Sequence, residues 1–158
     1  MIRIYWKKGE AQESAAFKEQ LLGEGAEIKK GPHGKPYLEQ GPFFSLSHSK
    51  GILAMALGEQ ELGLDLEGPR AITHKGFIRS EEEGIDPLTL WVVKESFMKY
   101  TGEGIRQFRS VRAEKKEENL YWVTDGAKSA YAQTFQIEDC IGAVTAEKIE
   151  EIKTEQSK

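Results

Sequence analysis

The chain has 158 residues, of which 39% are hydrophobic and 30% are charged, and its net charge is −4. These values suit one compact soluble domain or two small lobes packed together. They argue against a membrane span, because no run of about 18 apolar residues occurs, and against broad attraction to nucleic acid or anionic lipid. The first ten residues lack the features of a signal peptide, and the single Cys140 excludes an internal disulfide, so we expect a cytoplasmic protein.

The first third of the chain is predicted to begin with a strand and a helix. The helical composition ends at Gly23, which suits a C-cap. Glycine and proline then indicate a loop, and two apolar segments indicate strands joined by a turn at Lys50 and Gly51. In order, these elements are a strand over 2–6, a helix over 11–22, a loop over 29–38 and strands over 42–49 and 52–58.

The next segment, "ELGLDLEGP" over 61–69, alternates leucines with other residues. On a strand, the three leucines point to one face and Asp65 and Glu67 to the other, about 6.6 Å apart. The pattern predicts that this strand forms a hairpin with the preceding one. The two acids either line the solvent side of a half-buried strand or hold a shared ligand.

A second helix is predicted after a weakly helical segment over 71–84. It has Asp86 as N-cap, Pro87 at its first position and Gly102 at its C-cap. Strand-like segments over 107–114, 119–124, 130–137 and 140–146 follow, and the chain ends in a charged, solvated tail over 148–158.

The helix over 87–101 is apolar on nearly every side, which is typical of a buried helix. Glu95 lies on the same stripe as Trp91, and Lys99 lies one turn further along that stripe. An intrahelical pair between Glu95 and Lys99 is one interpretation, worth about 0.2–0.5 kcal/mol. The other is that Glu95 joins Asp65 and Glu67 around a cation.

The cation hypothesis follows from the repulsion among the three acids. Two carboxylates about 5 Å apart repel by roughly 3 kcal/mol at an effective dielectric constant of about 20. A third carboxylate adds to this cost unless a cation lies among them. A few hard oxygen ligands suit Mg²⁺, which commonly binds substrate phosphates as well.

Four motifs in order resemble those of the 4′-phosphopantetheinyl transferase superfamily, in its surfactin-synthetase-activating branch. They are "GKPYL", "FSLSHS", "GLDLE" and "WVVKESFMK", which together cover most of residues 34–104. The resemblance implies an α+β, pseudo-duplicated fold of antiparallel sheets packed with helices. It divides the chain into a shortened N-terminal lobe over 1–61, a C-terminal lobe with the metal motifs over 62–147 and the tail over 148–158.

The resemblance also implies a Mg²⁺-dependent transferase with coenzyme A as co-substrate. Such an enzyme moves the 4′-phosphopantetheine group to a serine of an acyl or peptidyl carrier protein. Chemistry of this kind depends on positioning and charge neutralisation, which a metal and several cations supply. By motif position, the metal ligands are Asp65, Glu67 and Glu95; the residues for coenzyme A phosphates are Lys35, Ser47 and His48; and those facing the pyrophosphate and leaving group are Lys94 and Lys99.

The general base of the family is matched best by Glu82, with Glu81 or Glu83 possible through a one-residue shift. The alternative for this acidic stretch is a solvated turn, with a metal-bound water as the base.

Two other functions stay open from the sequence. One is a non-catalytic relative that binds coenzyme A or a carrier domain, which the shortened N-terminal lobe favours. The other is a Mg²⁺-dependent nuclease, which would need a lysine shortly after the strand acid, where Gly68 and Pro69 follow Glu67.

Overall fold

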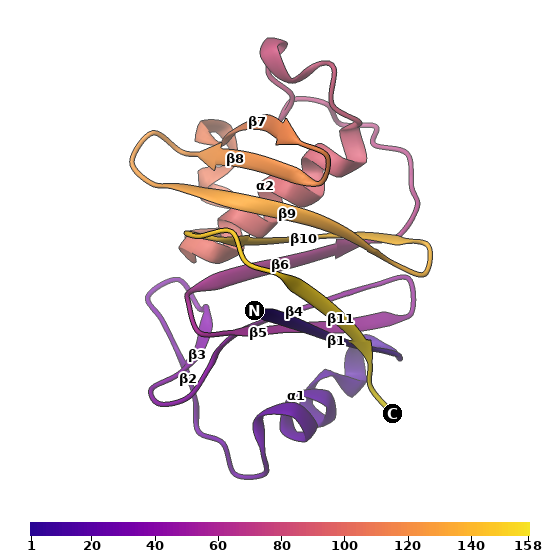
Figure 1. Ribbon diagram of the computed structural model, residues 1–158, viewed down its shortest axis with the longest axis vertical. Helices are drawn as coiled ribbons and strands as arrows, with labels where there is room; N and C mark the ends of the chain where they lie inside the picture. The colour runs from indigo at the N-terminus through magenta and orange to yellow at the C-terminus, as the bar shows by residue number, and fades with distance from the viewer.

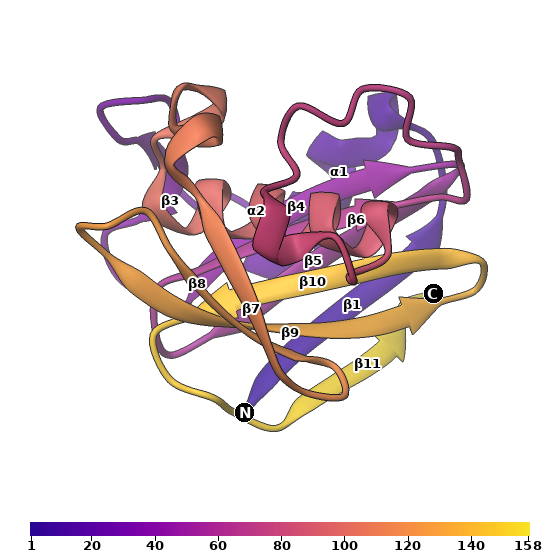
Figure 2. The ribbon, with the colours of Figure 1, turned by 90° about the horizontal axis from the view of Figure 1, so that it is seen from above.

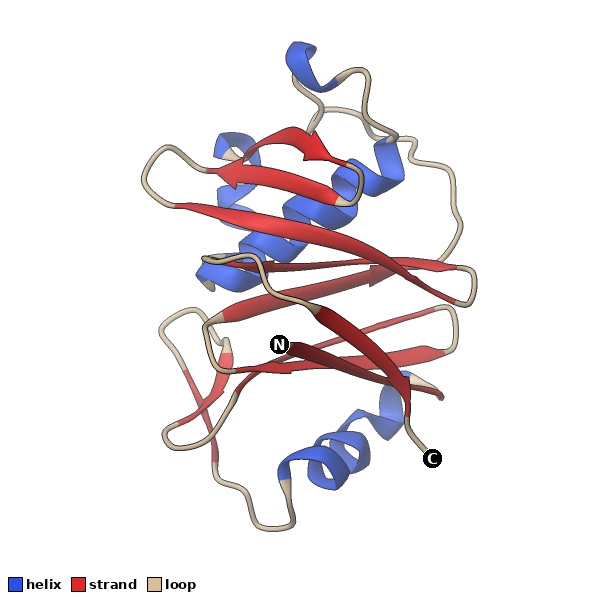
Figure 3. Ribbon diagram, in the orientation of Figure 1, coloured by secondary structure: helices blue, strands red, loops and turns tan.

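The computed structural model describes residues 1–158, apart from the side chains of residues 105–107. It confirms the α+β class, with strands in the middle of the molecule and helices around them (Figures 1 and 3). The bounds of the helical elements are η1 Ala11–Glu13, α1 Ser14–Leu22, η2 Ser80–Glu82, α2 Pro87–Thr101 and η3 Gly104–Ser110. Within the described part of the chain, no helix is long and apolar enough to cross a membrane.

The first sheet has the strand order β11-β1-β5-β4. Its strands are β1 Ile2–Lys8, β4 Phe43–Ser49, β5 Ile52–Gly58 and β11 Ile152–Gln156. β1 and β5 are antiparallel, whereas β11 runs parallel to β1, beside which it lies in Figure 2. A small hairpin of β2 Ile28–Lys30 and β3 Pro36–Leu38 occupies the region expected to be a loop.

The second sheet has the order β6-β10-β9-β8-β7 and is antiparallel throughout. Its strands are β6 Leu62–Glu67, β7 Arg112–Glu117, β8 Leu120–Thr124, β9 Ser129–Ile137 and β10 Cys140–Ala146. The predicted hairpin of β5 with β6 is therefore wrong, because β6 pairs with β10 in the other sheet. The segment over 71–84 is a loop with only the short η2, and the strand expected over 107–114 begins at Arg112, with the side chain of residue 107 outside the described residues.

Three hydrophobic clusters lie between the layers of the fold. α1 packs through Phe17 on the outer face of the first sheet, and α2 packs through Phe97 on the second sheet. Between the sheets, Ile4 of β1 meets Leu64 of β6 in the third cluster. In Figure 1 α1 lies below the first sheet and α2 lies behind the second. Each sheet thus has one helix on the face that it turns away from the other sheet.

α2 forms as its capping residues predict. The carboxylate of Asp86 accepts a hydrogen bond from Thr89 N at 3.1 Å, and Gly102 adopts the left-handed conformation with φ 78°. Such a C-cap favours glycine because other residues strain there. The end of α2 is therefore fixed, and with it the register of Glu95 and Lys99.

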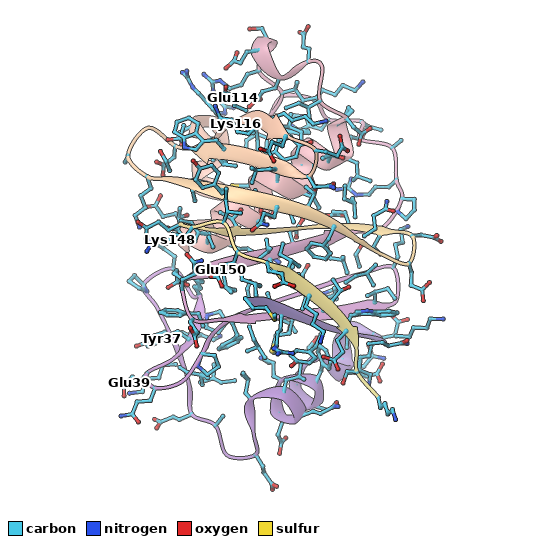
Figure 4. All side chains as sticks on the ribbon, viewed as in Figure 1. Tyr37, Glu39, Glu114, Lys116, Lys148 and Glu150 are labelled. Atoms are coloured by element: carbon cyan, nitrogen blue, oxygen red, sulfur yellow. The ribbon has the colours of Figure 1, made fainter. Side chains whose placement is uncertain are left out.

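The tail over 148–158 contains a strand that its charged composition did not predict. β11 is an edge strand with mostly exposed side chains. Two glutamines hold the segment that precedes it, labelled at Lys148 and Glu150 in Figure 4. Gln60 donates to Lys148 O at 3.0 Å, and Gln133 donates to Glu150 O at 2.9 Å. This segment thereby joins the β5–β6 turn to the second sheet.

Candidate functional site

The two faces of β6 divide as the leucine pattern predicts. The leucines enter the cluster between the sheets, and the other face is covered by α2 rather than by solvent. Gly63 makes this possible, because a Cβ there would lie 2.2 Å from Tyr100 N and 2.3 Å from Ser96 O. The missing side chain lets α2 approach β6, so the acids of β6 and the polar stripe of α2 come together.

Asp65 is the most deeply buried of the three acids, with 6% relative exposure. Its Oδ1 lies 3.5 Å from Lys99 Nζ and 3.5 Å from Ser47 Oγ. Its Oδ2 is buried and has no hydrogen-bond partner among the described residues. Burial raises the pKa of Asp65 to about 7, against the pull of Lys99 and with further increases from Glu95 and Glu67.

Glu67 lies at the end of the strand and uses both of its oxygens. Oε1 accepts a hydrogen bond from Trp91 Nε1 at 3.3 Å, and Oε2 pairs with Arg70 Nε at 3.1 Å. The donor from Trp91 comes from the stripe of α2 that the sequence identified. Arg70 was not predicted, and its position three residues after Glu67 is the only signal for it in the sequence.

Glu95 is half-buried on α2, on the same stripe as Trp91 and Lys99. Burial raises its pKa, Lys99 lowers it, Glu67 raises it and Arg70 lowers it. Lys99 also donates to Leu46 O at 3.3 Å, so it joins α2 to β4 beside the acids. The structure therefore gathers the predicted acids close enough to affect one another's charge.

The arrangement offers carboxylates but no assembled metal site among the residues with described side chains. Among the residues with described side chains, no group of three His, Cys, Asp or Glu could hold a metal ion as it stands. Both oxygens of Glu67 are engaged, and Lys99 pairs with Oδ1 of Asp65. The unpartnered, buried Oδ2 of Asp65 nevertheless leaves an unmet need for a cation or donor. Carboxylate oxygens beside it are the ligand type that Mg²⁺ prefers, so the donor type, and not the present arrangement, fits this ion.

Glu82 is not in a wet acidic turn, and that expectation is wrong. It is fully buried and forms an ion pair with buried Lys94 at 2.6 Å. Its other oxygen accepts from Ala113 N at 2.7 Å, and Oε1 accepts from Arg79 N at 2.9 Å. Its carboxylate thus has no exposed surface and both of its oxygens accept hydrogen bonds, and its predicted role as general base stays a prediction. The exposed neighbours Glu81 and Glu83 do not share this burial.

Lys94 is buried and makes its contacts within the protein. Its Nζ donates to Phe77 O at 2.6 Å as well as to Glu82, and burial lowers its pKa against the effect of that carboxylate. These contacts engage its Nζ within the protein, and its predicted contact with a pyrophosphate stays a prediction. The pair of Glu82 and Lys94 instead joins α2, η2 and β7.

The serines of "FSLSHS" connect the two sheets. The hydroxyls of Ser45, Ser47 and Ser49 accept hydrogen bonds from three backbone N–H groups of the segment containing β6, at 2.9, 3.0 and 2.8 Å. The donors are Leu64, Leu66 and Gly68. We refer to these three contacts as the serine seam. Ser47 is therefore buried and engaged within the protein, and its predicted role in phosphate binding stays a prediction.

His48 is exposed and points to the opposite side of β4 from Ser47, because adjacent strand residues alternate. The structure thus separates two residues that the sequence placed in one phosphate site. His48 does not line any of the cavities described below.

Lys35 connects the β2–β3 hairpin to α2 and to the start of β6. Its Nζ pairs with Glu61 and donates to Leu62 O and Tyr100 O, both at 3.0 Å. Burial lowers its pKa, while Glu61 raises it. As it stands, all three N–H groups of Lys35 are used within the protein.

Two cavities lie on either side of Lys35. The larger, of about 850 Å³, is also lined by Lys30, Lys128 and Tyr37, which projects from the hairpin in Figure 4. The smaller, of about 240 Å³, extends to Lys99, which reaches Asp65. A series of basic side chains therefore leads from the larger cavity to the acids. Lys128, in the turn between β8 and β9, was not predicted from the sequence, because it is distant along the chain from the other basic side chains of this cavity.

A basic segment over 105–116 follows α2, and the side chains of its first three residues lie outside the described residues. Arg109 and Arg112 are exposed. Comparison with known protein families and with curated proteins found no match.

Proposed function

We propose that the protein is a 4′-phosphopantetheinyl transferase that acts on an acyl or peptidyl carrier protein. The observation that carries the proposal is the buried, unpartnered Oδ2 of Asp65 beside Glu67 and Glu95. The "GLDLE" and "WVVKE" segments, which resemble motifs of the transferase family, meet at this place. An ordinary structural acid would have its buried oxygens satisfied.

The three acids would hold Mg²⁺, which when bound would neutralise the charge of the phosphoryl group being transferred. Lys99 lies beside Asp65 and supplies a positive charge for the leaving phosphate. The new bond joins the carrier serine oxygen to the β-phosphorus of coenzyme A. The bond from the β-phosphorus to the oxygen that bridges it to the α-phosphate breaks, adenosine 3′,5′-bisphosphate leaves, and the proton of the serine hydroxyl passes to solvent. We assign no residue of this chain as the base, because Glu82 is enclosed.

The larger cavity supports a place for the nucleotide part of coenzyme A. Its lining has three lysines, Lys30, Lys35 and Lys128, against two glutamates, Glu61 and Glu103, and it also includes Tyr37 and Tyr100. Lysines bind phosphates as point charges, and a nucleobase stacks on aromatic rings. The smaller cavity then lies between this place and Lys99.

The test is transfer itself. The protein is incubated with coenzyme A, Mg²⁺ and a panel of apo carrier proteins, and intact masses are recorded. We expect one carrier to gain one phosphopantetheine group, with no gain in EDTA or when its serine is replaced by alanine. Asp65→Ala should abolish the gain, whereas Asp139→Ala, at an exposed acid of the β9–β10 turn, should not. A panel with no modified carrier, under conditions where a known transferase modifies it, would refute the proposal.

A second candidate is a relative that binds coenzyme A without transfer. The burial of both Glu82 and Lys94 favours it, because two of the predicted catalytic residues are committed to an internal pair. Calorimetry combined with the mass measurement separates the two candidates. If the protein binds coenzyme A without transfer, calorimetry will detect binding of coenzyme A while every carrier keeps its original mass.

A further inference from the structure

Glu67 is held by two groups of different mobility. Trp91, which donates to Oε1, is packed edge-on against Phe77 at a ring-centroid distance of 5.2 Å and against Phe108 at 5.9 Å. Arg70, which pairs with Oε2, is 41% exposed and lies in the loop after β6. Moving Trp91 would disrupt an aromatic cluster, whereas Arg70 can move into solvent.

Arg70 also affects the charge of the neighbouring acid, since it lowers the pKa of Glu95. Together with Lys99 it supplies two positive charges to three carboxylates. A divalent cation that binds all three acids must displace a resident contact. Among the resident groups, Arg70 has the most exposed side chain, at 41% against 35% for Lys99.

We propose that Arg70 is a displaceable resident cation that competes with a divalent metal for Oε2 of Glu67. The inference rests on the metal site of the proposed function. Before the metal binds, Arg70 neutralises the outer end of the acidic cluster. Trp91 keeps Glu67 oriented while Arg70 leaves, so Oε2 becomes free for the metal. Competition by Arg70 therefore raises the concentration of divalent cation that is needed to occupy the site.

The competition predicts a specific effect of removing Arg70. An exposed ion pair of this kind corresponds to a factor of about two to five in an equilibrium constant. We therefore expect Arg70→Ala to bind Mn²⁺, used as a spectroscopic substitute for Mg²⁺, about two to five times more tightly than the wild type. Lys75→Ala is the matched control, because Lys75 is an exposed cation of the same loop and its loss changes the net charge equally.

The experiment is a Mn²⁺ titration followed by electron paramagnetic resonance at pH 8, with wild type, Arg70→Ala, Arg70→Lys and Lys75→Ala. A second readout is the fluorescence of Trp91 in a background where Trp6 and Trp122 are replaced by phenylalanine. We expect the signal from Trp91 to change at the metal concentration that occupies the site, and at lower concentration in Arg70→Ala.

Equal affinities of Arg70→Ala and Lys75→Ala for Mn²⁺ would overturn the inference, as would the absence of Mn²⁺ binding in all variants. Tighter binding in Arg70→Ala together with a weaker effect in Arg70→Lys supports it. The proposed function would fail in a different way: the variants would bind Mn²⁺ with the expected order of affinities, but no carrier protein would be modified. Far-ultraviolet circular dichroism checks that each variant is folded.

Discussion

Replacing Asp65 by asparagine isolates the electrostatic cost of the acidic site without removing its shape. Asp65 is 6% exposed, and its pKa is about 7 in the folded protein against an ordinary value of 3.8. The folded state therefore holds this proton at pH values where the unfolded state has lost it. The contribution of Asp65 to the unfolding free energy is therefore at its maximum below about pH 4, and it is lost as the pH rises toward 7.

The size of the loss follows from the two pKa values. A tenfold change in a proton equilibrium is worth about 1.36 kcal/mol, so the full penalty is about 4 kcal/mol. Roughly 2–3 kcal/mol of it falls between pH 5 and pH 8. Asparagine does not titrate, so the difference in unfolding free energy between variant and wild type should shift by that amount in favour of the variant. Comparing differences cancels the other titrating groups.

The assay is urea unfolding followed by tryptophan fluorescence in EDTA at pH 5, 6, 7 and 8. Asp139→Asn serves as the control, since that acid is exposed, and its difference from wild type should be independent of pH. Mg²⁺ should stabilise the wild type at pH 8 and leave Asp65→Asn unaffected, by mass action on the folded state. A wild type and an Asp65→Asn variant with parallel pH profiles would show that Asp65 is ionised at ordinary cost and refute the reasoning.

Other substitutions test the contacts that place the site. Gly63→Ala puts a methyl group 2.2 Å from the backbone of α2. We expect it to lower the unfolding free energy, measured in urea, by about 3 kcal/mol or more. Gly84→Ala is the control, because nothing lies within 4 Å of an added methyl group there, and we expect a loss of less than about 0.5 kcal/mol. Lys94→Met leaves Glu82 buried and unpaired, so thermal and urea unfolding should show a loss of about 3–5 kcal/mol. Adding Glu82→Gln to Lys94→Met should recover part of it; a further loss in the double variant would contradict a coupled pair.

Local signals in the sequence were enough to predict α2. Asp86, Pro87 and Gly102 fix its ends through neighbouring backbone groups, and no distant contact is required. The stripe of Trp91, Glu95 and Lys99 follows from the period of the helix alone. The same applies to the two faces of β6, which depend only on alternation.

The pairing of β6 with β10 could not be read in this way, because its partner lies beyond α2 and three strands. Glu82 was misjudged for a related reason. Its neighbours Glu81 and Glu83 are exposed, and only the buried side of α2, where Lys94 lies, shows that the middle acid turns inward. β11 was hidden by charged residues, which are frequent on edge strands because they discourage pairing with other chains.

The serine seam has a consequence for the order of folding. Its contacts join residues 19 apart in the chain, whereas the pairing of β6 with β10 must close a loop that contains α2 and three strands. Shorter loops cost less entropy to close, so we expect the seam to form first. A φ-value near 1 for Ser47→Ala and near 0 for substitutions in β10 would be its kinetic signature. The strand that carries Asp65 and Glu67 is then positioned by β4 of the first sheet, before the sheet to which it belongs is complete.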